Sequence, residues 1–235
     1  TSTWHALRAL ELDDTLAETH ALLGMLRKEL DFNWPEVERE LRRAFELNPR
    51  SPLVRLRHAI SLLLPMGRLD EAVTELEAMV RTDPLSLFTH WWLGVMVIMA
   101  RRFDRTVEEG RHMIELDPTH FFGHWVLGTG LDGSGAVEEA LEELERAHEL
   151  SGGIPFTRGF LACACGRAGR RERAVELLAE VEQAAAAGYV PPSTFAFGYA
   201  GLGEWDAAFK WLEKAHEVRD PLIMPIKSYY SLDPI

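Results

Sequence analysis

A turn signal recurs along this chain at an almost constant interval. Its four clearest copies end at Pro49, Pro84, Pro118 and Gly152, so a period of about 34 residues separates each copy from the next. Proline cannot continue a helix, and glycine accepts the left-handed conformation that caps one, so each copy is a helix stop. A helix stop that recurs at this period predicts an array in which the same supersecondary unit is repeated.

Two further series of positions stay in phase with the turns, because they recur at the same interval. One series consists of Val37, Ala72, Thr106, Ala140, Ala174 and Ala208. The other consists of Gly24, Ile60, Gly94, Gly128, Ala162 and Ala196. Most of these residues are small, which lets the backbones of two helices approach closely.

Each period divides into two helices. Apolar residues recur at helical spacing before and after an internal turn, as at Leu93 and Val97 and then at Met113 and Leu116. Glycines that permit a tight turn separate the two halves in four copies: Gly67, Gly135, Gly169 and Gly203. A single pair of helices cannot enclose a core, so the pairs are expected to stack on one another.

This pattern resembles the tetratricopeptide repeat. Leu93-Gly94 and Leu127-Gly128 are similar to its first-helix signature, and Ala140, Leu144 and Ala147 to its second-helix signature. The resemblance extends from about Thr3 to about Pro221. It implies an all-α fold, a right-handed α-α superhelix of about six helix pairs plus flanking helices. The sequence departs from the pattern at Ala59-Ile60, at Thr106, Gly110 and Met113, and by one extra residue within Glu29 to Trp34.

The repeat phase predicts a single array over residues 1–235. We expect an orphan helix at 3–12, repeats at about 15–50, 51–85, 86–119, 120–153, 154–187 and 188–221, and a capping segment at 222–235. The orphan helix and the absence of an initiator methionine lead us to expect that the chain is cut from a longer one.

The last third resembles a narrower group, the tetratricopeptide-repeat regions of bacterial signalling proteins. The residues that carry this likeness are Tyr189-Val190-Pro191-Pro192, Tyr199 to Glu204, Trp211 to Ala215 and Arg219-Asp220-Pro221. In that group the array is usually the C-terminal part, after a winged-helix, adenylyl-cyclase or kinase domain. The resemblance therefore implies a regulatory or sensory arm that binds a protein or peptide segment in a concave groove.

The first helix of each pair is expected to line that groove. Phe88, Trp91 and Val95 share one helix face because they lie at i, i+3 and i+7, and Phe122 and Trp125 occupy matching positions one repeat later. The predicted partner-binding groove comprises Arg57, Phe88, Trp91, Val95, Met99, Phe122 and Trp125. The other predicted inward positions are Glu18, Ala21, Met25, Lys28, Val54, Ser61, Leu64, Thr129, Asp132, Phe156, Gly159, Cys163, Ser193, Phe197 and Ala200. The aromatic residues would bind an apolar or amphipathic segment. Alternatively, they are buried against one another or under a preceding part of a longer chain.

Other kinds of site are not favoured by the sequence. A clamp for a C-terminal carboxylate needs converging cations, and only Lys28 and Arg57 qualify. His20, His90 and His124 share one repeat position but lie about 10 Å apart, beyond the reach of a shared metal ion. Cys163 and Cys165 are two residues apart on a helix, too close in sequence for a disulfide and on different faces. We therefore predict no metal, no cofactor, no catalytic residue and no enzymatic activity.

The net charge of −12 disfavours phosphate backbones and anionic membranes as partners. No apolar run of 18 residues is present, so we expect no membrane span. Because we expect no structural disulfide and find no signal peptide at the start of the sequence, we expect a cytoplasmic location. The expected partner is a protein or peptide segment. The alternative is a structural module that forms a homodimer and has no peptide ligand.

Overall fold

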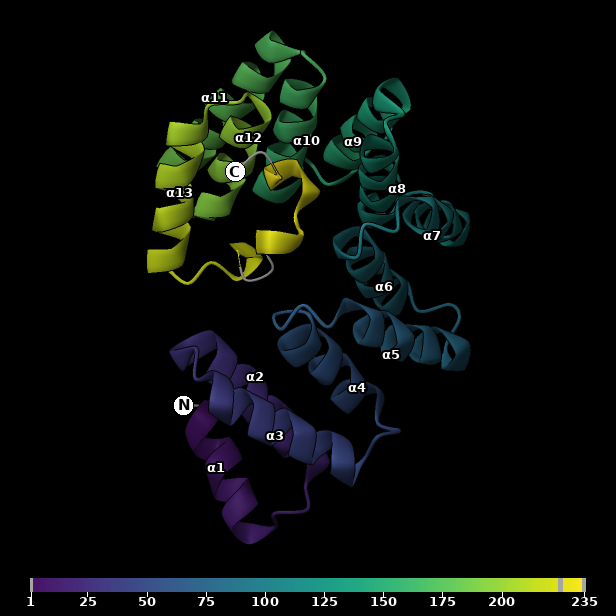
Figure 1. Cartoon of the computed structure of the whole chain (residues 1–235), viewed down its shortest axis with the longest axis vertical. Coiled ribbons are helices and arrows are strands. Elements are labelled where there is room, and N and C mark those ends of the chain that lie inside the picture. Colours follow the sequence, from purple (N-terminus) through teal and green to yellow (C-terminus); the bar gives the residue numbers. More distant parts are fainter. Residues whose placement is uncertain (1, 224–225, 234–235) are drawn as a thin grey trace. The chain divides into compact units, whose positions relative to one another are not determined.

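Helices account for almost all of the secondary structure in a computed structural model of the chain, which describes residues 2–223 and 226–233 (Figure 1). The described residues contain no β-strand. The α-helices are α1 (Ser2–Leu12), α2 (Ala17–Asp31), α3 (Trp34–Leu47), α4 (Pro52–His58), α5 (Leu69–Thr82), α6 (Leu87–Met99), α7 (Phe103–Leu116), α8 (Phe121–Ser134), α9 (Val137–Leu150), α10 (Pro155–Arg167), α11 (Arg171–Ala187), α12 (Pro192–Gly201) and α13 (Trp205–Glu217). The predicted all-α class of repeated helix pairs is confirmed.

The chain divides into two compact units, Thr1–Met96 and Val97–Ile235, with the boundary inside α6. The division of the chain into a single array of repeats stays a prediction.

Small residues in unit 1 allow its helices to pack closely. Ala21 and Ala44 are fully buried in a core that also contains Val37, Leu41 and Val54. Gly24 lies against Leu41, and a Cβ atom at Gly24 would come within 2.6 Å of the Leu41 Cγ atom. Gly24 and Val37, one from each of the two in-phase series, thus lie where α2 and α3 meet.

The departure from the pattern at Ala59-Ile60 coincides with an irregular turn. α4 continues into a π-helical turn, η1 (Ala59–Leu63), where the Leu64 N–H donates to the Ala59 carbonyl oxygen at 2.9 Å. A π turn accommodates one extra residue within a helix. The first helix of this pair therefore widens where leucine and glycine are replaced.

In unit 2 the backbones of α7 and α8 are in contact at a glycine. A Cβ atom at Gly110 would lie 2.5 Å from the Leu127 backbone nitrogen, which cannot move as the end of a flexible side chain can. Gly110 also departs from the repeat pattern, which usually has a bulky residue there. The missing side chain is what permits the close approach of the two helices.

The repeated histidines tie the two helices of a pair together. His20 Nδ1 lies 2.6 Å from Glu40 Oε2 on α3, and His20 Nε2 lies 3.0 Å from the Asp14 carbonyl oxygen. His124 repeats the contact with Glu143 at 2.7 Å in unit 2. Within residues 2–223 and 226–233, no group of three or more His, Cys, Asp or Glu side chains is placed to hold a metal ion.

A buried carboxylate holds the end of unit 2 in place. Asp220 is almost fully buried, and its Oδ2 atom accepts the Ser193 N–H at 3.0 Å, at the start of α12. Its Oδ1 atom accepts the Leu222 N–H at 3.1 Å. Asp220 thus satisfies an N-terminal amide of α12 that no neighbouring side chain caps.

The chain then continues in 3₁₀ turns: η2 (Pro221–Ile223), η3 (Ile226–Ser228) and η4 (Tyr230–Leu232). We call residues 226–233 the C-terminal tail. Among the described helices, none combines the length and the hydropathy required to cross a membrane.

We expect Gly110→Ala to destabilise the chain, because the added methyl group would overlap the Leu127 backbone. Overpacking of this kind costs about 1–3 kcal/mol of unfolding free energy. Gly188→Ala is the matched control, since a Cβ atom at Gly188 would meet nothing within 4 Å. Urea unfolding of both variants and the parent measures the difference. Equal midpoints for Gly110→Ala and Gly188→Ala would contradict the close contact.

Candidate interaction surface

One face of unit 2 carries a continuous row of aromatic rings from the first helices of three successive pairs. The Trp125 ring on α8 lies 5.2 Å from the Phe160 ring on α10, and the Phe160 ring lies 5.0 Å from the Phe197 ring on α12. Phe156 also belongs to the row, 5.1 Å from Trp125. We call this row, together with the polar residues beside it, the aromatic face. Ring pairs at these separations stabilise one another beyond the apolar area they bury.

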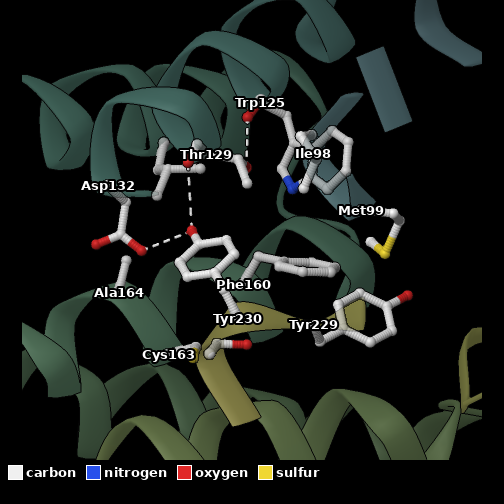
Figure 2. A pocket seen from close by; sticks show the side chains of 12 residues that line it. Ile98, Met99, Trp125, Thr129, Asp132, Phe160, Cys163, Ala164, Tyr229 and Tyr230 are labelled. Atoms are coloured by element: carbon white, nitrogen blue, oxygen red, sulfur yellow. Dashed lines mark hydrogen bonds between the residues drawn. The ribbon is translucent and has the colours of Figure 1, made fainter. Parts of the chain in front are cut away.

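The C-terminal tail lies on the aromatic face (Figure 2). The Tyr229 ring is buried 4.8 Å from the Phe197 ring and 6.4 Å from the Phe160 ring. Ser231 and Leu232 are buried as well. A segment remote from α8 in sequence thus covers α8, α10 and α12.

Tyr230 makes the most specific contact of the tail. Its hydroxyl donates to Asp132 Oδ2 at 2.7 Å, and the Thr129 carbonyl oxygen lies 3.3 Å from the same hydroxyl (Figure 2). The Phe103 ring meets the Tyr230 ring edge-on at 5.1 Å, and the Arg167 guanidinium lies 5.1 Å from the ring centre. The Asp132 carboxylate favours the neutral phenol, and the cation over the ring adds a further attraction.

An ion pair holds the end of the tail. The Arg101 guanidinium binds both carboxylate oxygens of Asp233, and the Nη1–Oδ2 distance is 2.7 Å. Both side chains are partly exposed, so the pair adds geometric specificity more than stability. Arg101 adopts a left-handed backbone conformation at φ 56°, shortly after α6.

The tail leaves almost no free space on this face. The remaining cavity, between Trp125, Phe160 and Tyr230, has a volume of about 20 Å³, room for about one water molecule. The buried indole nitrogen of Trp125, on the wall of this cavity, has no hydrogen-bond partner among the described residues. The tail therefore fills the hollow that these side chains form.

Cys163 lies under the tail. It lines the same cavity as Ser231, and burial raises the pKa of Cys163 to about 12. Burial also raises the pKa of Cys165, to about 11, but Cys165 lies beside Glu145 and Arg173. The two thiols thus have different surroundings, and that of Cys163 includes the tail.

The seven residues of the predicted groove fall in both units. Arg57, Phe88, Trp91 and Val95 belong to unit 1, and Met99, Phe122 and Trp125 to unit 2. Phe88 is 53% exposed, whereas Met99 and Trp125 are each 3% exposed. The other four are half-buried: Arg57, Trp91, Val95 and Phe122. Because no experiment or comparison tests this set as a binding site, the site itself stays a prediction.

Trp125, Thr129 and Asp132, which the repeat phase assigns to one face of α8, line the same cavity. Sequence reasoning missed Phe160, Tyr229, Tyr230 and Arg101. Two adjacent tyrosines in a short terminal segment were a signal that this segment packs on something.

Phe88 also lines a cleft within unit 1. The cleft has a volume of about 700 Å³ and lies between the start of α4, the end of α5 and the start of α6. Leu53 and Phe88 provide exposed apolar surface, and Arg50, Arg55 and Asp83 provide charges. Elsewhere in unit 1, burial lowers the pKa of Lys28, and the charge of Arg57 lowers it further.

Solved structures share this fold at low sequence identity. A tetratricopeptide repeat protein from Parabacteroides merdae ATCC 43184 has a TM-score of 0.71 and 11% identity, over 98% of this chain and 91% of its own. MamA 41-end from Desulfovibrio magneticus RS-1 has a TM-score of 0.56 and 16% identity, over 74% of this chain and 97% of its own. This chain has a tetratricopeptide-repeat-like fold. No family model and no curated protein matches the sequence. The structural likeness extends to the fold and does not specify a ligand.

We expect the tail to leave the aromatic face at strongly alkaline pH. Burial and the neighbouring Asp132 raise the pKa of Tyr230 well above its ordinary value of 10.0. The Tyr230 contact is therefore complete below about pH 10, where a released tyrosine is still neutral, and is lost as the pH rises through the raised pKa. Tyrosinate absorbance during a pH titration, compared between the parent and Tyr230→Phe, measures this. A parent Tyr230 that ionises near pH 10 would contradict the bound tail.

Proposed function

We propose that this chain is a protein-interaction scaffold that binds a segment of a partner protein on the first helices of its pairs. The single observation that supports this proposal best is the tail on the aromatic face. A short segment of 3₁₀ turns already lies across α8, α10 and α12, with its tyrosines among Trp125, Phe160 and Phe197. A face that accommodates one such segment has the shape and chemistry to receive another.

Accessible aromatic residues supply further contacts in this proposal. Phe88 lines the cleft of unit 1, and the centre of its ring lies 5.9 Å from that of Trp91 on α6. Phe122 lies half-buried on α8. Large aromatic side chains in a hollow surface are typical energetic centres of protein interfaces. We assign them, with Arg57 and Val95, to partner contact. Met99 and Trp125 are both buried in unit 2, and Trp125 belongs to the aromatic face that the tail covers.

The biological setting we propose is the regulatory or sensory arm of a larger bacterial signalling protein in the cytoplasm. Its support is the resemblance in the last third of the chain, including Trp211 to Ala215 and Arg219-Asp220-Pro221. Asp220 caps α12 and so has a structural role that is independent of any effector domain.

A pull-down with the full chain as bait tests the proposal. We expect Phe88→Ala/Trp91→Ala to lose a partner that the parent captures, because truncating an aromatic interface residue commonly costs about 2 kcal/mol or more, about thirtyfold in affinity. Tyr189→Ala is the matched control, since Tyr189 is 75% exposed and lies outside the cleft and the aromatic face. Circular dichroism verifies that each variant is folded.

Equal capture by the parent and the folded double variant would contradict partner binding at Phe88 and Trp91. Light scattering on the same samples measures self-association. A parent dimer that Phe88→Ala/Trp91→Ala converts to a monomer would assign these residues to contact with a second copy of the chain.

A further inference from the structure

The tail satisfies several requirements of a bound peptide ligand. Tyr229 is buried beside Phe160 and Phe197, the Tyr230 hydroxyl pairs with Asp132, and the Asp233 carboxylate pairs with Arg101. These contacts come from side chains that follow one another along a short run. Sequence-specific peptide recognition uses the same kind of arrangement, in which separate side chains of the peptide enter separate pockets.

The hold on the tail depends on few interactions. Its described main-chain hydrogen bonds are local, from Leu232 N–H to Tyr229 and from Asp233 N–H to Tyr230. The contacts with the helices are made by side chains, and the Arg101–Asp233 pair is open to solvent. Local opening of a terminal segment of this kind requires much less free energy than unfolding of the helices.

We propose that the C-terminal tail is an intramolecular ligand that occupies the aromatic face and excludes a partner segment of the same chemistry. The partner segment carries an unmodified tyrosine, which corresponds to Tyr230. An aromatic residue precedes it directly, as Tyr229 does, and a carboxylate follows three residues later, as Asp233 does. This inference rests on the proposed function, because it specifies the partner and the regulation of the same surface.

The receptor side chains define this chemistry. Asp132 accepts a phenol hydrogen but would repel a phosphotyrosine, and Arg101 favours an anionic side chain. The buried indole N–H of Trp125 has no described hydrogen-bond acceptor, and a carbonyl oxygen of a partner segment placed differently from the tail would supply one.

Tethering explains how the tail competes. A segment attached to its own binding surface has an effective concentration of about millimolar, so a free peptide of moderate affinity is excluded. The apparent dissociation constant of a partner equals its intrinsic value divided by the fraction of molecules with the face open. Weaker contacts between the tail and the aromatic face therefore strengthen partner binding without any change in the aromatic face itself.

The probe is a fluorescein-labelled, C-terminally amidated peptide with the sequence of residues 227–233, Lys-Ser-Tyr-Tyr-Ser-Leu-Asp. The tail-weakened variant is full-length Tyr230→Ala/Asp233→Ala, which leaves the receptor side chains unchanged. By fluorescence anisotropy we expect the peptide to bind this variant about tenfold or more tighter than the parent or Tyr189→Ala.

A charge exchange tests the Arg101 contact. Adding Arg101→Glu to the tail-weakened variant is expected to weaken the peptide. A second peptide with arginine in place of the final aspartate is expected to recover binding to that triple variant. Failure of the second peptide to recover binding would contradict recognition of the carboxylate by Arg101.

Cys163 reports tail release in the absence of any peptide. In a Cys165→Ala background we expect Cys163 to react slowly with a disulfide reagent in the parent, faster in the tail-weakened variant, and slowly again when the peptide is added. Equal Cys163 rates in the parent and in the folded tail-weakened variant, with no peptide binding, would overturn the inference.

The outcomes separate the two proposals. If partner capture depends on Phe88 and Trp91 but the peptide does not bind, the inference about the tail is overturned and the proposed function is not. Peptide binding without any captured partner would contradict only the proposed contacts at Phe88 and Trp91. A parent dimer that Tyr230→Ala/Asp233→Ala converts to a monomer would assign the tail to a second copy and overturn the intramolecular arrangement.

Discussion

Close approach of helix backbones at small residues is the constraint on which the rest of this structure depends. Gly24 lies against Leu41 in unit 1, and Gly110 lies against the backbone at Leu127 in unit 2. A helix pair has too little apolar surface to be stable alone, so each pair gains its core from its own contact and from its neighbours. The side chains of the first helices that lie outside these contacts then form a surface.

In unit 2 the C-terminal tail occupies that surface. Aromatic rings on α8, α10 and α12 would expose a contiguous apolar area if the tail were absent, and such areas normally bind something. Tyr229 and Tyr230 cover the rings, while Asp132 and Arg101 provide polar partners at defined positions. A single segment thus completes the core of the unit and blocks the surface that the fold makes available.

The repeat period in the sequence was sufficient to predict the helix pairs, because helix stops and small residues are required at the same phase in every copy. The phase also placed Trp125, Thr129 and Asp132 on one face of α8. It could not predict that Trp125 is buried whereas Phe88 is exposed. Both are aromatic residues at predicted groove positions of a first helix, and their exposure depends on which other segments cover them.

The sequence by itself determined the all-α class and the pairing of helices. These properties follow from local rules, namely helical periodicity, helix termination and the sizes of residues at contacts. Only the tertiary structure decided that the C-terminal tail returns to α8, α10 and α12 and that Tyr230 pairs with Asp132. That contact joins residues 98 positions apart, and it depends on shape complementarity between a hollow and a segment, which has no periodic signal in a sequence.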